Sequence, residues 1–483
     1  VELLYNGGIG TYVKASQQSH QEANDRGNDI LRVDANQLQA RVIGEGGNLG
    51  LTQKARIEFA THGGHVITDA IDNSAGVDCS DHEVNIKILL STLVSRGEMT
   101  GKQRDALLAT MTEDVGRLVL ADNYLQTQAI ALEVAAGKER LDAHGRLLRH
   151  LETHAGLQRD IEALPDEQAL AERTQQKRAL TAPEIAVLLA YVKISLKQTI
   201  LASALPDTDD VHDLLVGYFP SALRESCADS LPAHPLRREI IANQLVNRLV
   251  NRMGTTFVLQ MEEETAASAV DIAAAFHAAN AVLDGEALWQ TLEALDLQLP
   301  SSRQYALMHD LRALVAAATG RLLAEYRAGT TIAALIADYR PAVQATLARL
   351  RQNGAGVEAV TALIDARDAV IATFDQVKLA RLCGHPLPAI ETALASLRQQ
   401  LDVDWLAAAI QRLPAGNRWQ ARARAQLTDD LAHLRQHLLQ QVLAAQPLVS
   451  TPASAILDEL KANAPQDLAM LSSGLAEIRQ LLS

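Results

Sequence analysis

The chain has 483 residues, of which 48% are hydrophobic and 21% charged, and this length and composition predict a folded protein with two or more domains. Its formal net charge of −14 argues against a nucleic-acid-binding protein, because phosphate contacts need a basic surface. Three widely separated cysteines predict neither a disulfide framework nor a metal site, and no apolar run is long enough to span a membrane. We therefore expect a cytoplasmic protein that binds neither nucleic acid nor membrane.

The N-terminal residues alternate short apolar runs with polar turns. Residues 1–5 are expected to form a buried strand, and the tight turn 6–8 follows it. Its glycines match neither common phosphate-loop pattern, which favours a plain strand-to-helix turn over a cofactor contact. Residues 17–31 are expected to form a polar helical crossover. The chain also begins within an apolar run and without Met, which leads us to expect a piece of a longer protein.

A second strand is expected to end at Val42–Ile43, before the turn Glu45–Asn48, where glycines suit a sharp bend or a close approach to a ligand. Thr52 is the predicted N-cap of the next helix, which Gly63–Gly64 should end. Residues 65–68 predict another short strand. This alternation predicts part of a doubly wound, Rossmann-like α/β sheet, in which ligands bind beyond the C-terminal ends of the strands.

Polar residues in the turns of this segment have two interpretations each. Asn48 and Asn73 suit the amide of a nicotinamide ring, but asparagine is also a common turn residue. Ser80 stands three residues before a glutamate, which predicts a helix N-cap there, and a hydroxyl at a helix N-terminus could also bind a carboxylate. Asp69 and Asp72 could cap backbone groups or act as a general base, although no partner is evident.

From residue 80 onward the sequence predicts a large all-α region. The charged residues 135–178 predict an exposed helical hairpin or a mobile arm, and Thr181 with Glu184 predicts a capping box. A long helix over residues 236–253 should stop at Gly254. The Ala/Leu-rich remainder has no spacing typical of a metal or nucleophile site. We expect three parts, whose bounds are 1–97, 98–205 and 206–483.

Several motifs that follow one another along the chain resemble the second half of the nucleotide domain of glutamate dehydrogenases. They are EGGN, Thr52, and the run VITDAIDNSAGVDCSDHE. The longer phrases NGGIGTYVKAS and LTAPEIAVLLAYVKISLK are similar to the large bacterial NAD-specific enzymes of that family. The resemblance implies that NAD contacts a set of turn residues, and that Ser80 binds a substrate carboxylate. The implied NAD-binding residues are Gly46, Gly47, Asn48 and Asn73.

The chain departs from the family pattern at Gly47, Thr68, Val84 and the pair Ser74–Ala75, where the family has Ala, Pro, Trp and Ala-Gly. The family's catalytic lysines, aspartate and glycine-rich phosphate loop have no match here, so no catalytic residue and no metal ligand is assigned. We accordingly expect that the isolated chain has no dehydrogenase activity.

The resemblance implies part of a homo-oligomeric enzyme that oxidatively deaminates L-glutamate to 2-oxoglutarate and ammonia with NAD. Another amino-acid dehydrogenase of the superfamily, or a non-catalytic helical module for assembly or regulation, is the alternative. The helical half is expected to serve assembly or regulation in either case.

Overall fold

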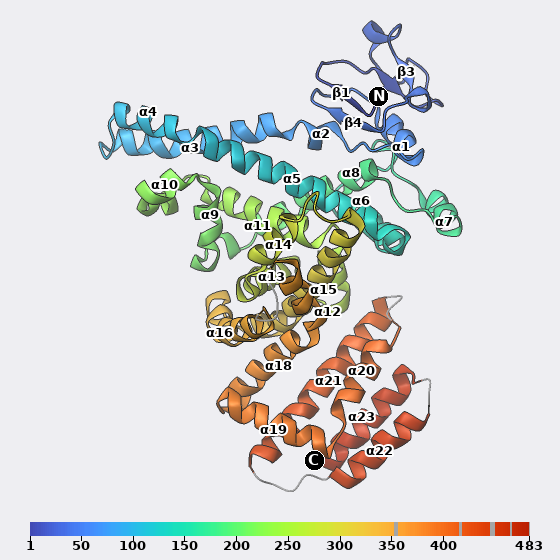
Figure 1. Ribbon diagram of the computed structural model, residues 1–483, viewed down its shortest axis with the longest axis vertical. Helices are drawn as coiled ribbons and strands as arrows, with labels where there is room; N and C mark the ends of the chain where they lie inside the picture. The colour runs from blue at the N-terminus through green and yellow to red at the C-terminus, as the bar shows by residue number, and fades with distance from the viewer. Residues whose placement is uncertain (352–355, 415–417, 445–449, 464–465, 483) are drawn as a thin grey trace. The chain divides into compact units, whose positions relative to one another are not determined.

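The computed structural model describes residues 1–351, 356–414, 418–444, 450–463 and 466–482 (Figure 1). The chain forms two compact units, one of residues 1–258 with 299–312 and the other of residues 259–298 with 313–483. All strands among the described residues lie within the first 45 residues, and the rest of the described structure is mainly helical. The expected order of a small α/β start and a large helical remainder is therefore confirmed.

Two small parallel sheets replace the single doubly wound sheet that the sequence predicts. Strand β1 (Leu3–Asn6) pairs with β4 (Val42–Glu45), which confirms the strand predicted at Val42. Strand β2 (Val13–Lys14) pairs with β3 (Val33–Asp34) over two residues each. The strand predicted over 65–68 is wrong, because only His65 makes a bridge, to Val42. A Rossmann-like sheet is thus not established by these strands.

Strand β1 is not buried, contrary to the prediction for residues 1–5. Leu3 is 57% exposed and Tyr5 is 67% exposed. The physical reason is that β1 pairs only with β4 among the described residues, so its other edge and much of its surface have no neighbour.

Helix α1 (Gln53–Thr61) organises the small apolar core of this segment. The Thr52 side chain accepts a hydrogen bond from the Ala55 N–H at 3.1 Å, which confirms the predicted N-cap. Gly63 follows the helix with a φ of +89°, as expected for a helix stop. The core residues around α1 are Val13, Ala35, Ile43, Leu51, Ala55, Phe59 and Val66.

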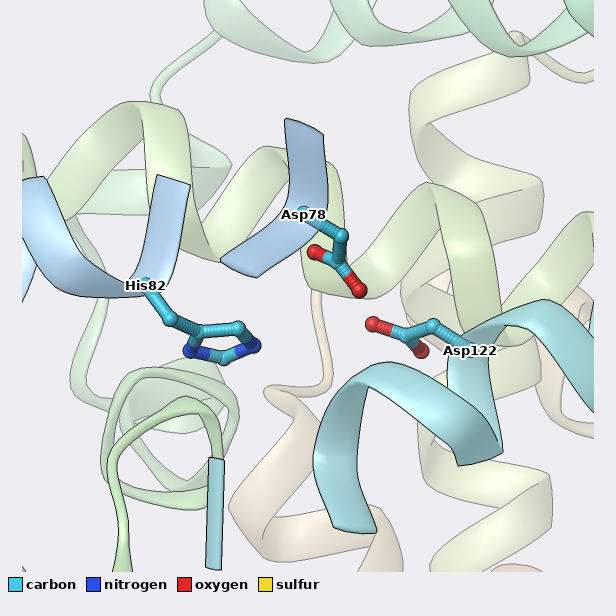
Figure 2. A group of neighbouring side chains, drawn as sticks. All are labelled: Asp78, His82 and Asp122. Carbon is cyan, nitrogen blue, oxygen red and sulfur yellow. The ribbon is translucent and has the colours of Figure 1, made fainter. Parts of the chain in front are cut away.

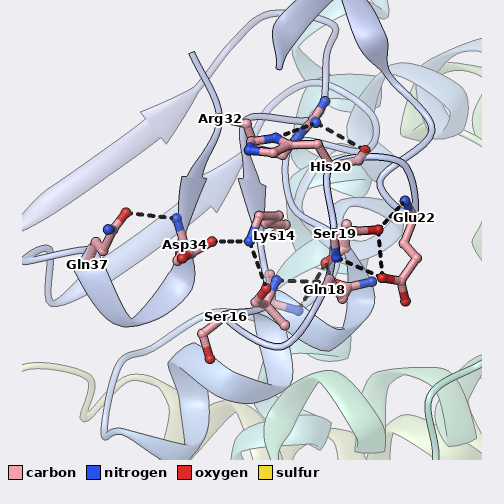
Figure 3. A network of polar contacts seen from close by, with 12 residues as sticks. Lys14, Ser16, Gln18, Ser19, His20, Glu22, Arg32, Asp34 and Gln37 are labelled. Carbon is pink, nitrogen blue, oxygen red and sulfur yellow. Dashed lines mark hydrogen bonds and ion pairs between the residues drawn. The ribbon is translucent and has the colours of Figure 1, made fainter. Parts of the chain in front are cut away.

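Residues 17–31 form turns and one short 3-10 helix, so the predicted helical crossover is wrong. Polar side chains hold this loop in place of helical backbone bonds (Figure 3). The Arg32 guanidinium donates to the carbonyl of Thr11 at 2.8 Å and to Asp29 at 2.5 Å. At the start of the loop, the Ser16 N–H and hydroxyl each donate to Glu58 at 2.6 Å.

The chain after α1 enters helices earlier than predicted. Helix α2 (Asp69–Asp72) is followed directly by α3 (Ser74–Ser95), so the helix expected near Ser80 already begins six residues before it. Glu83 pairs with Lys87 one turn later instead of closing a capping box. Helix α3 ends at Ser95, and Gly97 follows it with a φ of +74°.

The first unit continues as packed helices, and residues 135–178 are part of this packing rather than an exposed arm. Helix α6 (Leu141–His154) buries Leu147, Leu148 and Leu151. The predicted capping box of Thr181 and Glu184 is confirmed, and so is the helix stop at Gly254. The remaining helices here are α4 (Gly101–Thr110), α5 (Thr112–Ala136), α7 (Glu167–Gln175), α8 (Ala182–Leu201), α9 (His212–Tyr218), α10 (Ser221–Ser226) and α11 (Arg237–Met253).

A buried ionic cluster lies in the core of the first unit. The Glu133 carboxylate is 3.1 Å from His144 Nε2 and 3.4 Å from Arg312 Nη1, and all three side chains are almost fully buried. Burial acts to raise the pKa of Glu133, but the hydrogen bond with His144 and the charge of Arg312 outweigh it and lower the pKa to about 2. Gly254 sits against this carboxylate, since a Cβ there would lie 2.0 Å from Glu133 Oε1.

The second unit is entirely helical over its described residues. Helix α13 (Ala269–Leu283) is buried along almost its whole length. Among the described helices none is long and apolar enough by itself for a membrane span, although α12 (Phe257–Thr265) and α13 meet that criterion as a bent pair. Helices α12 and α15 (Ser301–Arg327) are divided between the two units. The other helices of the second unit are α14 (Gly285–Glu293), α16 (Ile332–Arg351), α17 (Val357–Asp365), α18 (Arg367–Cys383), α19 (Leu387–Gln400), α20 (Val403–Arg412), α21 (Arg418–Leu443), α22 (Ser450–Ala462) and α23 (Leu468–Leu482).

The geometry at Gly254 predicts that Gly254→Ala lowers the free energy of unfolding by at least about 2 kcal/mol, because it adds left-handed strain and displaces a buried carboxylate. Gly97→Ala is the matched control, since Gly97 also has a positive φ but its Cβ would meet nothing within 4 Å. Urea unfolding of both variants measures the difference. Equal losses would show that the Glu133 cluster does not constrain position 254.

Candidate functional site

The candidate site lies where the parallel strands β1 and β4 end side by side. Asn6 and Glu45 are the last register partners of the two strands. The turn after β4 folds back on the turn after β1, because the N–H groups of Gly46 and Gly47 both donate to the Asn6 carbonyl, at 2.8 and 3.1 Å. The two polar turns therefore meet at the C-terminal edge of the strand pair, as expected.

Gly47 is required by the close approach of these two turns. A Cβ at this position would lie 2.5 Å from the carbonyl oxygen of Gly8, which is backbone and cannot swing aside. A Cβ at Gly46 would instead meet the hydroxyl of Tyr5, the mobile end of an exposed side chain. The departure from the family's alanine at position 47 thus has a local steric cause in this chain.

A buried ionic clamp fixes the turn to helices α1 and α2. The Glu45 carboxylate is fully buried and accepts from Arg56 Nε at 2.7 Å and from Arg56 Nη2 at 2.9 Å. Arg56 Nη2 also lies 3.1 Å from Asp69 Oδ1 at the start of α2. The guanidinium therefore joins strand β4, helix α1 and helix α2 through one side chain, in the bidentate geometry that makes such pairs strong.

The aspartates of α2 accept hydrogen bonds from the backbone of the turn rather than acting as free bases. Asp69 Oδ2 accepts from the Leu49 N–H at 2.8 Å, and Asp72 Oδ2 accepts from the Glu45 N–H at 2.9 Å. Burial raises the pKa of Asp72 to about 6, with a further rise from the nearby Glu45 carboxylate. The capping interpretation of these two residues is the one that the structure supports.

Asn48 and Asn73 come together across the edge. Asn73 Nδ2 donates to Asn48 Oδ1, and Asn73 is also the residue that immediately precedes α3. Asn48 is exposed, so the amide pair faces outward from the clamp beneath it. These two residues lie 25 positions apart in the sequence, and the clamp brings the turns that carry them into contact.

Ser80 lies on α3, within its second turn, and is exposed. Its hydroxyl donates to the Gly76 carbonyl at 3.1 Å, so the N-cap predicted here is wrong. No hydrogen bond joins Ser80 to Asn48 or Asn73 among the residues that the structure describes. What Ser80 offers is a single accessible hydroxyl on the helix that begins beside Asn73.

Arg56 is the main residue of the site that the sequence analysis missed. It stands between Ala55 and Phe59, which are both buried core residues of α1. A charged residue beside the apolar face of a short helix is a signal that a buried partner exists. The identity of that partner was not readable, because Glu45 and Asp69 belong to other segments.

The clamp predicts that Arg56→Met lowers the free energy of unfolding by about 3–5 kcal/mol, because it leaves the Glu45 carboxylate buried and unpaired. Arg41→Met is the matched control, since Arg41 pairs with Glu2 at 3.6 Å with both side chains largely exposed. Thermal and urea unfolding of both variants tests this. A small effect of Arg56→Met, similar to that of the control, would contradict the clamp.

The raised pKa of Asp72 predicts a pH-dependent effect of Asp72→Asn. A carboxyl whose folded pKa is near 6 stabilises the fold at low pH and loses that contribution as the pH rises through 6. Asp72→Asn should therefore be more stable than the unsubstituted protein at pH 8, by a margin that shrinks toward pH 4. Urea unfolding across this range measures the margin, with Asp105→Asn as an exposed control. A stability margin independent of pH would contradict a raised pKa of Asp72.

Comparison with known proteins identifies the chain's relatives. Residues 1–133 match the family model of the bacterial NAD-glutamate dehydrogenase catalytic domain, and residues 177–365 and 348–482 match that of the glutamate dehydrogenase C-terminal region. The chain is 38% identical to an NAD-specific glutamate dehydrogenase of Pseudomonas aeruginosa, over all of this chain and 32% of that protein.

Two further relatives carry the same name. The Halomonas elongata protein is 38% identical over 92% of this chain and 28% of its own length, and the Mycobacterium tuberculosis protein is 36% identical over all of this chain and 32% of its own length. The chain thus spans about a third of the length of these relatives. It belongs to the glutamate dehydrogenase family.

Proposed function

We propose that this chain is part of an NAD-dependent glutamate dehydrogenase, which converts L-glutamate, water and NAD⁺ to 2-oxoglutarate, ammonium, NADH and a proton. The observation that carries the proposal is the Asn48–Asn73 amide pair, which the Glu45–Arg56–Asp69 clamp holds at the C-terminal edge of two parallel strands. In open α/β sheets this edge is where ligands bind. Residues 1–97 are the second half of a Rossmann-like NAD-binding domain, 98–205 a helical extension and 206–483 a helical C-terminal domain.

The edge suits a nicotinamide cofactor in its glycines and its side-chain amides. Gly46, Gly47, Asn48 and Asn73 are the residues that would hold NAD, because glycines admit close approach and amides pair with a carboxamide. The nearby carboxylates of Glu45 and Asp69 both pair with Arg56. The single positive charge of Arg56 offsets part of their negative charge, which reduces the repulsion of an anionic cofactor. Bound NAD would supply the hydride acceptor.

Ser80 is proposed to donate a hydrogen bond to a carboxylate of the substrate. Its hydroxyl is exposed and, among the described residues, bonds only to the Gly76 carbonyl of its own helix, so it can turn toward a ligand. Because Ser80 lies inside α3 and not at its N-terminus, the helix N–H groups add nothing to this contact. The role is therefore binding and orientation, and the proposal assigns no catalytic residue to this chain.

The assembly and location of the enzyme are part of the same proposal. We place the enzyme in the cytoplasm as a homo-oligomer that binds no nucleic acid. The helical region that follows the α/β segment would serve that assembly or its regulation. Its second-unit core, formed around residues such as Leu406, Leu434 and Leu471, supports a stable helical body in the described part of the chain.

Steady-state kinetics of the full-length protein test this proposal. Asn73→Ala removes one amide of the pair, so KM for NAD should rise about tenfold with KM for glutamate little changed. Ser80→Ala should raise KM for glutamate and leave KM for NAD little changed, because it removes a hydrogen-bond donor to the substrate. Ser91→Ala, an exposed serine on the same helix, is the control and should change neither constant.

The same measurements separate the alternatives. If Ser80→Ala raised KM equally for glutamate and for an amino acid with an aliphatic side chain, the preference for glutamate would not depend on Ser80. If the full-length protein bound no NAD in a calorimetric titration, the chain would be a helical module without the proposed activity.

A further inference from the structure

A second group of polar side chains lies between helices α3 and α5. Asp78 and His82 are four residues apart on α3 and so share one face of that helix, and Asp122 faces them from α5 (Figure 2). One ligand atom of each of the three side chains lies within 4.8 Å of the others. The group lies within the first unit and plays no part in the proposed NAD contacts.

The His82 ring is buried and held in place without using its nitrogens. It is 2% exposed, and its Nδ1 has no hydrogen-bond partner among the described residues. The ring stacks on Tyr218 with centroids 4.4 Å apart, and the Tyr218 hydroxyl donates to Asp81 at 2.9 Å. In Figure 2 the ring nitrogen turned toward the carboxylates of Asp78 and Asp122 is Nε2, whereas Nδ1 points away from them. No hydrogen bond of Nε2 is found among the described residues either.

The two carboxylates of the group have no close counter-ion. No hydrogen bond or ion pair of Asp78 or Asp122 is found within the described part of the chain, and both are half-buried. Burial raises the pKa of Asp78 to about 7, and the charges of Asp122 and Asp81 add to the rise. Lys193 on α8 is the cation that acts on Asp122, at longer range than an ion pair. A partly buried site with two acidic groups and one free imidazole favours a bound cation.

We propose that Asp78, His82 and Asp122 bind one divalent transition-metal ion that joins α3 to α5. One imidazole and two carboxylates form a ligand set that suits Zn²⁺, with a water at the fourth position. Bonds of 2.0–2.2 Å require ligand atoms about 3.4 Å apart. In the observed group the ligand atoms lie within 4.8 Å of one another, so a bound ion would draw them closer together. The Tyr218 stack then orients the histidine, as outer partners do in metal sites.

The structural consequence of the metal concerns the helix that starts at the amide pair. Helix α3 begins directly after Asn73 and carries Ser80, which lies between Asp78 and His82 in the sequence. An ion held by both helices would fix this part of α3 against α5. The inference goes beyond the proposed function, because it does not depend on which substrate or cofactor binds nearby.

Zinc titration of the full-length protein tests the proposal. The protein is first freed of metal with a chelator, and Zn²⁺ is then titrated in competition with a chromophoric chelator, with bound zinc counted by mass spectrometry. The unsubstituted protein should bind one equivalent of Zn²⁺. The Asp122→Asn and His82→Gln variants should bind Zn²⁺ at least about tenfold more weakly. Asp105→Asn and His62→Gln, at exposed positions, are the controls and should retain it.

Thermal unfolding keeps the test decisive if His82→Gln fails to fold. Asp122→Asn keeps the shape of the side chain and removes one of two neighbouring carboxylates. Without metal, this variant should therefore be at least as stable as the unsubstituted protein. Zn²⁺ should raise the Tm of the unsubstituted protein and leave that of Asp122→Asn unchanged. Equal zinc binding and equal Tm shifts in the two proteins would place the ion elsewhere and overturn the proposal. No zinc binding by the unsubstituted protein would also overturn it, in favour of a proton shared by the two aspartates.

Discussion

The N-terminal segment depends on one buried contact, between the Glu45 carboxylate and the Arg56 guanidinium. A charge with no exposed surface is tolerated only when it is paired and hydrogen-bonded, and Glu45 meets this condition through Arg56 and the Leu51 N–H. The pair links the end of β4 to α1, and Asp69 extends the link to α2. The position of the Asn48–Asn73 amides follows from this contact, because each amide lies in a turn that the clamp fixes.

Local signals predicted the parts of the fold that depend on neighbouring residues. The Thr52 cap, the Thr181–Glu184 capping box and the stop at Gly254 were readable because each needs only a few adjacent side chains. The start of α3 was missed because Ser80 and Glu83 have capping-box spacing, yet the helix had already begun at Ser74. A strong spacing motif inside a helix is indistinguishable in sequence from one at its end.

Features that depend on contacts distant in sequence were not predictable. Residues 17–31 are held in a loop by tertiary hydrogen bonds, because Arg32 donates to the His20 carbonyl and the Thr52 hydroxyl donates to Gln18. Asn48 and Asn73 were named as candidates from their turns, but their mutual contact required the fold. Arg56 gained its role from Glu45, eleven residues earlier, and His82 gained its neighbour Asp122 from another helix. The residue types therefore indicated candidate roles, whereas the partners of these residues could not be predicted from the sequence.

In the proposed function, the edge built on the Glu45–Arg56 clamp receives the nicotinamide end of NAD. The most direct test is an experimental structure of the full-length protein with NAD bound. The cofactor's nicotinamide end should lie against the side-chain amides of Asn48 and Asn73, with Gly47 in contact and the clamp intact. A cofactor bound away from this edge, with the two amides still paired to each other, would contradict it.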